Sequence, residues 1–243
     1  MITSRINLDQ QHSVVLHSYH YQNSSLIVNF FLKNHGKVSA IAKGVNTKKS
    51  GGNHSVLLQP FQSTIVSLTG KQELLILKNI EATDIHWQLS GKALYCAYYI
   101  NELLLRLLPS YSDCSDIFIL YNKVMTILAS GLEYFEAPLR LFELKLLDFL
   151  GYGLNLEFDC ESDVSIRRDK NYYYVLYSGA SENKPMASQY LVISGQSLLD
   201  LAHNQLSNPQ SLQQSKQLLK WALAEHLGHQ PLKSREIFKQ LYS

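Results

Sequence analysis

The segment "SVVLHSYHYQNSSLIVNFFLKNHGKVSAIAKG", residues 13–44, holds three short runs rich in Val, Ile, Tyr and Phe, separated by Asn, Ser and Gly. Such runs with turn residues between them are typical of β-strands. Two further runs of this kind follow, "STIVSLTG" at 63–70 and "ELLILKNI" at 73–80. Five short strands with one long basic loop before the fourth predict a small closed or nearly closed barrel.

After residue 80 the pattern changes to helical. The segment "GKALYCAYYINELLLRLL", 91–108, is apolar on almost every face, which predicts a helix at the centre of a bundle. Further helices are predicted at 113–130, at 137–153 and from 194 to the end, interrupted at 154–193 by two short strands, "NYYYVLYS" and "SQYLVIS". The fold class is therefore α+β, with a five-stranded barrel over 1–80 followed by an α-helical domain over 81–243 that carries a short β insertion at 154–193.

The charge is sorted along the chain. Residues 1–80 carry eight basic and two acidic groups, residues 81–213 nine and sixteen, and residues 214–243 five and two. A basic domain within a chain of net charge +2 indicates a polyanionic partner, although a solvated lysine-rich surface explains the same numbers. The chain has no run of eighteen apolar residues, and its three cysteines lie far apart, so we expect a cytoplasmic protein.

Motifs of catalysis are missing from the sequence. It contains no phosphate-binding G-x-x-x-x-G-K-[ST], no G-x-S-x-G and no H-E-x-x-H, and the predicted barrel has only two acids. A group of acids lies at Glu157, Asp159, Glu161 and Asp163, but it lacks the glycine and the final glutamate of a calcium loop. We therefore predict a solvated acidic loop and a protein that is not an enzyme.

Binding to a nucleic acid is the better hypothesis. Lysines bind phosphates and aromatic rings stack on bases, and the candidates for phosphate contacts are Lys37, Lys43, Lys48 and Lys49. The candidate rings are Tyr19, Tyr21, Phe30 and Phe31, of which half should be core because they lie in alternating strands. An RNA-binding barrel protein and a non-catalytic adaptor remain as alternatives.

Five segments in order carry a resemblance to a known family. They are "HGKVSAIAKGV" (35–45), "LLQPF" (57–61), "YINELL" (99–104), "PLRLFELKLLDFLGYG" (138–153) and "PLKSREIF" (231–238). In this order and spacing the chain resembles the bacterial RecO family of recombination mediators. The resemblance implies an N-terminal OB-fold barrel joined to a helical domain, and a cytoplasmic, nucleoid-associated role in DNA repair without catalysis or cofactors. Members bind single- and double-stranded DNA and anneal complementary strands. They act with RecR, and often RecF, to load RecA onto strands coated by the single-stranded-DNA-binding protein (SSB).

The sequence departs from some relatives, which carry a four-cysteine zinc finger in the insertion. Here the insertion contains only Cys160, and a tetrahedral thiolate site cannot be built from one cysteine, so we expect no metal.

The resemblance also implies a site for the acidic tail of SSB. Arg140 and Leu144 share one face of a predicted helix, and an arginine there would suit a free carboxylate. Lys216 and Lys220 on a later helix are candidates for contacts with the tail's aspartates. The alternative for Arg140 is an intrahelical ion pair with Glu143 or Glu136.

Overall fold

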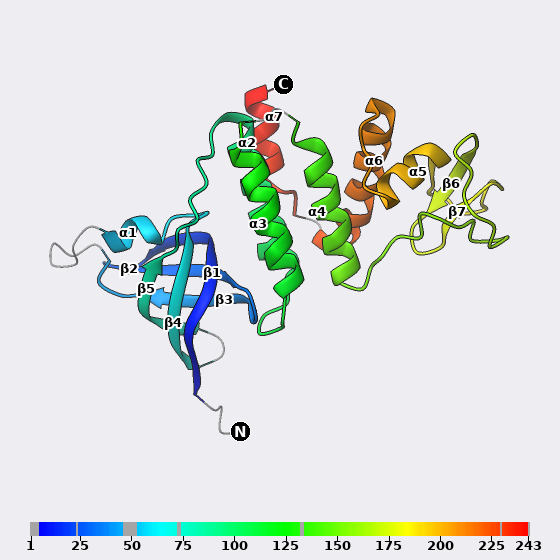
Figure 1. Ribbon diagram of the computed structural model, residues 1–243. Coiled ribbons are helices and arrows are strands. Elements are labelled where there is room, and N and C mark those ends of the chain that lie inside the picture. The colour runs from blue at the N-terminus through cyan, green and yellow to red at the C-terminus, as the bar shows by residue number, and fades with distance from the viewer. Residues whose placement is uncertain are drawn as a thin grey trace. The chain divides into compact units, whose positions relative to one another are not determined.

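The computed structural model describes residues 5–22, 24–45, 53–71, 74–131, 134–228 and 230–242. Two compact units make up the chain (Figure 1). Unit 1 comprises Met1–Gly131 and Leu232–Ser243, and unit 2 comprises Leu132–Pro231. The predicted division after residue 80 falls two residues before the last barrel strand ends, at Ala82. The first compact unit extends further and also includes the next two helices and the last one. None of the helices among the described residues is long and apolar enough to span a membrane.

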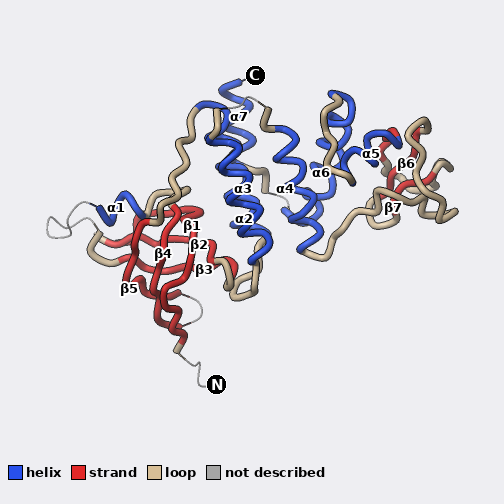
Figure 2. Tube along the Cα trace, in the orientation of Figure 1, coloured by secondary structure: helices blue, strands red, loops and turns tan. Residues whose placement is uncertain are grey.

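Unit 1 begins with a five-stranded closed barrel in the order β1-β2-β3-β5-β4 (Figures 1 and 2). Its strands are β1 Ile6–Tyr21, β2 Ser25–Leu32, β3 Gly36–Ala42, β4 Ser63–Lys71 and β5 Leu74–Ala82. Neighbours run antiparallel except β3 and β5, which pair in parallel and close the ring. A short helix, α1 Asn53–Leu57, lies between β3 and β4 in the sequence. The predicted barrel followed by helices is confirmed, although β1 starts earlier than the first predicted strand.

The interior of the barrel explains the alternation in the sequence. Successive residues of a strand point to opposite faces, so every second side chain enters the core. The buried cluster is made of Val15, Val28, Phe30, Leu32, Val38, Ala40, Ala42, Leu58, Val66, Leu68, Leu75 and Ile80. The residues between them face outward, and those that no helix covers are available to bind a ligand.

Three helices complete unit 1: α2 Gly91–Leu107, α3 Ser115–Ala129 and α7 Lys233–Tyr242. Two buried hydrogen bonds attach α2 and α3 to the barrel: the amide of Asn101 donates to the carbonyl of Leu16 at 2.9 Å, and the hydroxyl of Tyr121 donates to Asn101 Oδ1 at 2.8 Å. Phe31 of β2 adds edge-on ring contacts with Phe118 and Tyr121 of α3. The α2–α3 link also lies close to Gly36 (φ +62°), where a Cβ would lie 2.5 Å from the carbonyl oxygen of Pro109.

The last helix returns to α2. The carboxylate of Glu102 accepts hydrogen bonds from the backbone N–H of Lys233 and of Ser234, both at 2.9 Å, and from the Ser234 hydroxyl at 2.6 Å. These backbone N–H groups lie at the start of α7, where no preceding turn supplies acceptors, so Glu102 caps a helix that lies 131 residues away in the chain. Arg235 contributes a hydrogen bond to the Tyr99 hydroxyl. The segments "YINELL" and "PLKSREIF" are therefore in direct contact.

Unit 2 contains the remaining helices and strands: α4 Glu136–Phe149, β6 Asn171–Val175, β7 Gly179–Ser181, β8 Leu191–Ser194, α5 Gly195–Ala202 and α6 Pro209–Leu227. The three strands form one antiparallel sheet in the order β7-β6-β8. The prediction of two strands in the insertion missed β7, which lies in the expected polar turn. β7 has only three residues, and the backbone N–H of Cys160 donates to the carbonyl of Ala180 within it at 2.8 Å.

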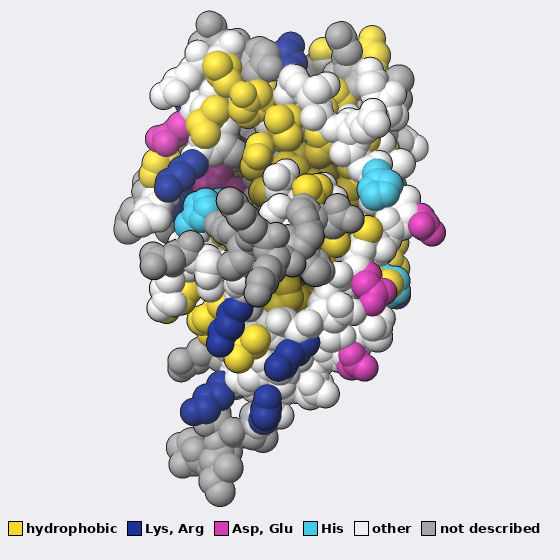
Figure 3. Space-filling view, turned by 90° about the vertical axis from the view of Figure 1, so that its left-hand side faces the viewer, with side chains coloured by type: hydrophobic (Ala, Val, Ile, Leu, Met, Phe, Trp, Pro, Cys, Tyr) yellow, Lys and Arg dark blue, Asp and Glu magenta, His cyan; other side chains and the backbone are white. Residues whose placement is uncertain are grey.

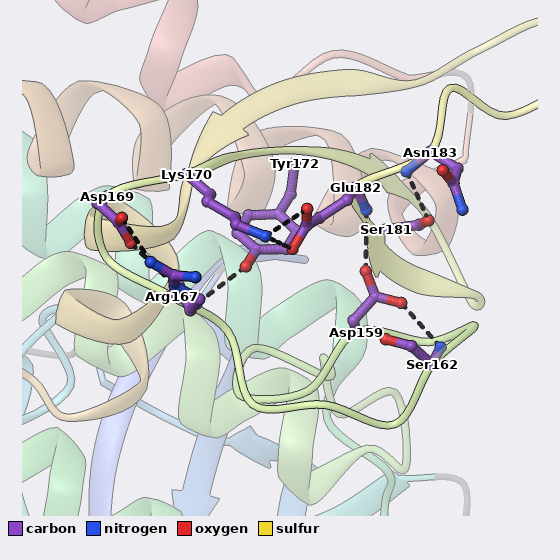
Figure 4. A network of polar contacts seen from close by, with 9 residues as sticks. All are labelled: Asp159, Ser162, Arg167, Asp169, Lys170, Tyr172, Ser181, Glu182 and Asn183. Carbon is purple, nitrogen blue, oxygen red and sulfur yellow. Dashed lines mark hydrogen bonds and ion pairs between the residues drawn. The ribbon is translucent and has the colours of Figure 1, made fainter.

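Asp159 organises the loop before this sheet (Figure 4). Its carboxylate accepts backbone hydrogen bonds from Glu161 and Ser162 at Oδ1, both at 3.0 Å, and from Glu182 at Oδ2 at 2.9 Å. Asp159 is only 6% exposed. The prediction of a solvated acidic loop is thus wrong for this residue, because its carboxylate is directed at backbone donors from two separate segments.

Replacing Asp159 with alanine should open the insertion at a cost on the order of 1.5–3 kcal/mol, because hydrogen bonds to a charged group are lost together. Burial by itself would raise the pKa of Asp159, but the donors from Ser162, Glu182 and Glu161 outweigh it and hold the pKa below its usual range. A carboxyl whose folded pKa is depressed stabilises the protein above the unfolded value of about 3.9, and this contribution is lost as the pH falls through the folded pKa. Protection of the Ser162 and Glu182 amides against hydrogen exchange, relative to their intrinsic rates, should be lost in the variant at neutral pH and in the wild type only below about pH 4.

Asp163→Asn is the matched control, since Asp163 is exposed, lies in the same loop and has a left-handed backbone (φ +55°) that Asn tolerates. Exchange in this control should equal that of the wild type. Equal exchange in Asp159→Ala and the wild type would show that the carboxylate does not hold the loop.

Candidate nucleic-acid interface

Two lysines lie side by side on the outer face of the barrel. The parallel register of β3 and β5 pairs Ala40 with Leu75 and Ile41 with Ile76, and continuing it by two residues, past the end of β3, brings Lys43 beside Lys78; both lysines line one pocket. Neighbouring strands are about 4.8 Å apart, so two ammonium groups can reach the same stretch of a phosphate backbone. Lys78 was not a predicted site residue, because nothing in the sequence shows that β3 pairs in parallel with β5.

The same row continues across two more strands. β2 and β3 pair Leu26 with Ala42, so Ser25 lies level with Lys43, and β1 pairs Tyr21 with Ser25. We call Tyr21, Ser25, Lys43 and Lys78 the barrel row. Residues directly opposite one another on paired strands point to the same face. The row therefore combines an exposed ring at one end with two exposed lysines at the other.

A shallow pocket borders the lysine end of the row. It is lined by Ala42, Lys43, Gly44, Val45, Leu58, Leu77, Lys78, Asn79 and Ile80. Lysines at the rim of a concave surface can contact a bound anion closely, and Gly44, which has no side chain, leaves room for the anion to approach the backbone. The arrangement has the chemistry of a phosphate-backbone contact.

The barrel cations are available for a partner. Lys43, Lys71 and Lys78 are exposed, and none of them forms an ion pair with another described residue. Figure 3 looks onto the barrel end of unit 1 and shows Lys and Arg side chains gathered in its lower part. Lysines without acidic partners there leave a positive field that a polyanion can neutralise.

The other predicted phosphate contacts differ in position. Lys37 is half-buried, and its ammonium donates to the backbone carbonyl of Leu105, near the end of α2, at 2.7 Å. Burial lowers the pKa of Lys37 below its usual value. This contact ties β3 to α2 and places Lys37 apart from the barrel row. Lys48 and Lys49 lie outside the described residues.

The predicted rings divide into two kinds. The alternation predicted that Phe30 or Phe31 is core, and both are fully buried. Phe30 belongs to the barrel core, as alternation predicts, whereas Phe31 points outward and is buried against α3. Tyr19 and Tyr21 are 46% and 38% exposed, and Tyr19 also stacks on His17 at 6.0 Å between ring centroids. Only the two tyrosines can present a ring face to a base.

In unit 2, the side chain of Arg140 on α4 is buried and does not lie on the protein surface. Its guanidinium donates to Glu143 Oε1 at 2.8 Å, and the two side chains are only 7% and 1% exposed. Of the alternatives left open by the sequence, the ion pair with Glu143 is the one found. Leu144 is buried as well, at 5% exposure.

The two predicted lysines of unit 2 lie on the neighbouring helix. Lys216 of α6 forms an ion pair with Glu136 of α4 at 2.7 Å, and Lys220 is exposed. Because Tyr152, just after α4, stacks on His226 near the end of α6, the two helices run in the same direction. Lys220 follows Lys216 by four residues, so the two lysines share one face of α6.

The cysteines lie apart from one another: Cys114 is buried, Cys96 partly buried and Cys160 exposed. Within the part of the chain that the structure describes, no group of three or more His, Cys, Asp or Glu side chains has the arrangement of a metal site.

Comparison with known proteins is consistent with this geometry. Residues 8–86 match the family model "Recombination protein O N terminal", and residues 88–236 match "Recombination protein O C terminal". A DNA repair protein RecO from Methylococcus capsulatus is 37% identical over 97% of this chain and 94% of its own length. The corresponding proteins of Pseudoalteromonas atlantica and Coxiella burnetii are 39% and 36% identical over 96% and 97% of this chain, and over 95% and 99% of their own lengths. The matches extend over both halves of the chain and nearly all of its length, so the chain belongs to the RecO family of DNA repair proteins.

Proposed function

We propose that this protein is a non-catalytic recombination mediator that binds single- and double-stranded DNA through the barrel row and anneals complementary strands. The observation that supports it best is the lysine pair Lys43 and Lys78, exposed, side by side and without ion-pair partners among the described residues. Such a pair lowers the repulsion between phosphates, while Tyr21 at the far end of the row offers a ring for a base.

Its proposed partners follow from the family. We propose that the protein acts in the cytoplasm, on the nucleoid, with RecR and in some circumstances RecF, to help load RecA onto SSB-coated single strands. The acidic SSB tail would dock on the α4–α6 face of unit 2. Lys216 and Lys220 are exposed there and suited to its aspartates, while Arg140 and Leu144 are buried residues of α4.

Binding at two or more salt concentrations tests the barrel row. On a single strand each neutralised phosphate contributes about −0.7 to the slope of log affinity against log salt. Changing Lys43 and Lys78 to alanine together should therefore weaken binding of a single-stranded oligonucleotide and make the slope shallower by about 0.7 for each phosphate that is no longer neutralised. The annealing rate of complementary strands should fall in parallel.

Lys123→Ala is the matched control, because Lys123 is an exposed lysine of unit 1 on α3 instead of the barrel. Its affinity, slope and annealing rate should match those of the wild type. An unchanged slope in the double variant would remove the barrel row from the DNA site, and preference for an RNA competitor of the same sequence would favour the RNA-binding alternative.

A further inference from the structure

A second pocket lies in unit 2, where three segments meet. It is bordered by the loop after α4, by the turn between β6 and β7, and by the last turns of α6. Its lining residues are Gly151, Tyr152, Gly153, Leu154, Asn155, Tyr174, Leu176, Tyr177, Ser178, Gly179, Ala222 and His226. The cavity volume is about 190 Å³. Pockets that enclose a drug-sized ligand measure roughly 300–1,000 Å³, so this one suits a single flat ring.

Aromatic rings define two sides of this pocket. Tyr152 stacks on His226 with 3.6 Å between ring centroids and 17° between planes, and Tyr177 meets His226 edge-on at 6.4 Å. Although His226 covers one face of the Tyr152 ring, the residue is still 44% exposed. Because Tyr152 also lines the pocket, part of its surface is available for contact with a third ring there.

Tyr177 has an unfavourable backbone conformation, and its side chain is exposed. It lies in the turn where Ser178 N–H donates to the carbonyl of Val175, and its φ is +67°. The left-handed region is costly for a bulky side chain, and such strain is concentrated at functional sites. The ring is nevertheless 74% exposed, so burial of the ring does not account for the strained turn.

The lining carries no lysine, arginine, aspartate or glutamate. It offers ring faces together with the amide of Asn155, the hydroxyl of Ser178 and backbone polar groups near three glycines. A phosphate or an acidic peptide would find no lysine or arginine in this pocket, whereas a neutral heteroaromatic ring finds both stacking surfaces and hydrogen-bonding groups. Nucleobases have this chemistry, and stacking on aromatic side chains tolerates any base.

We propose that this pocket, with Tyr152 and Tyr177 as its stacking rings, binds one unstacked base of a single DNA strand. The inference rests on the proposed function, because it gives unit 2 a contact with bases in addition to the phosphate contacts of the barrel row. A base held here would be unstacked from its neighbours. The rest of its strand would then stay unfolded and able to pair with a complementary strand.

Oligonucleotides with and without bases test the pocket. The probes are a fluorescent single-stranded oligothymidine and an abasic strand of equal length, which has the same phosphates. Tyr177→Asn is the main variant, since Asn adopts the left-handed backbone readily and the exposed ring supports no core. Its affinity for oligothymidine should fall roughly five- to a hundredfold, which corresponds to the stacking of one base, and its affinity for the abasic strand should stay that of the wild type.

Two controls accompany this variant. Tyr177→Phe keeps the ring and should bind like the wild type. Tyr134→Ala removes a tyrosine of unit 2 that is 87% exposed and lies outside the pocket, and it should also leave both affinities unchanged. In addition, irradiation of a bromouracil-containing strand should crosslink it to Tyr152, Tyr177 or His226.

The outcomes separate the pocket from the proposed function. If the wild type binds both strands equally well, with a salt-dependent affinity, or if Tyr177→Asn binds oligothymidine normally, the pocket holds no base and a protein side chain becomes the alternative occupant. The phosphate contacts proposed for the barrel row would survive that result. If the wild type binds neither strand, the proposed function itself is overturned, and this inference with it.

Discussion

Replacing Arg140 with alanine is expected to destabilise unit 2 by about 3–5 kcal/mol, the usual cost of removing one member of a buried ion pair. The guanidinium of Arg140 and the carboxylate of Glu143 are 2.8 Å apart, with side chains only 7% and 1% exposed. Water does not reach the carboxylate well enough to replace the lost charge, so the variant must bury the Glu143 anion without its arginine or open the helix packing around it. Chemical denaturation monitored by circular dichroism measures the difference.

The same helix supplies a matched control. Lys145 and Asp148 have the same i, i+3 spacing in α4, but their side chains are 54% and 40% exposed. An exposed pair of this kind contributes about 0–1 kcal/mol, so Lys145→Ala should change stability little. Equal losses of stability in Arg140→Ala and Lys145→Ala would contradict the assignment of Arg140 to a buried pair.

A double variant separates the structural role of Arg140 from the proposed SSB-tail contact. In Arg140→Met/Glu143→Leu both charges are replaced by apolar side chains of similar size, and stability should recover much of the loss, because such replacements of buried pairs are often neutral or stabilising. If the double variant is folded but binds an SSB tail peptide poorly, the guanidinium takes part in the site. If it binds the peptide as the wild type does, the site depends on Lys216, Lys220 and their surroundings, and Arg140 serves only to hold α4.

The alternation of residues 13–44 was sufficient to predict the barrel strands, because inward and outward positions differ in chemistry at every step. The closing pair was not predictable in this way. β3 and β5 lie more than thirty residues apart and pair in parallel over a short stretch, and no local pattern encodes that choice. Lys78 was missed for this reason, and Lys43 was found without its neighbour.

Burial was the second quantity that the sequence did not provide. The chemistry of Arg140 and Leu144 suited a carboxylate-ended peptide, but Glu143 lies within the same helix and pairs with the arginine below the surface. Lys37 likewise belongs to the basic strand, although its ammonium is used by the carbonyl of Leu105. In both cases the charge pattern was correct. The contact of Lys37 with Leu105 is tertiary, whereas the Arg140–Glu143 pair is local to α4, and only its burial depends on the packing of the folded chain.

The largest effect in unit 1 is expected for Phe31→Ala, which should destabilise the unit by about 3–5 kcal/mol. Phe31 points outward from the barrel, as a ligand-binding ring would, yet it is fully buried because it packs against α3. Its ring centroid lies 5.2 Å from that of Phe118 and 6.1 Å from that of Tyr121. Truncation leaves a cavity between barrel and helix and removes support from Tyr121, whose hydroxyl holds Asn101.

Tyr19→Ala is the opposite case on the same outer face, since Tyr19 is 46% exposed on β1. Its effect on stability should remain within about 0.5 kcal/mol, as is usual for exposed positions. Its effect on single-strand binding should be the larger one, because an exposed ring beside the barrel row can stack on a base. Folded Phe31→Ala protein, measured well below its unfolding midpoint, should bind DNA with wild-type affinity. A Phe31→Ala variant that is as stable as the wild type but defective in binding would reverse these roles and place the DNA strand between the barrel and α3, where the structure instead has a packed aromatic core.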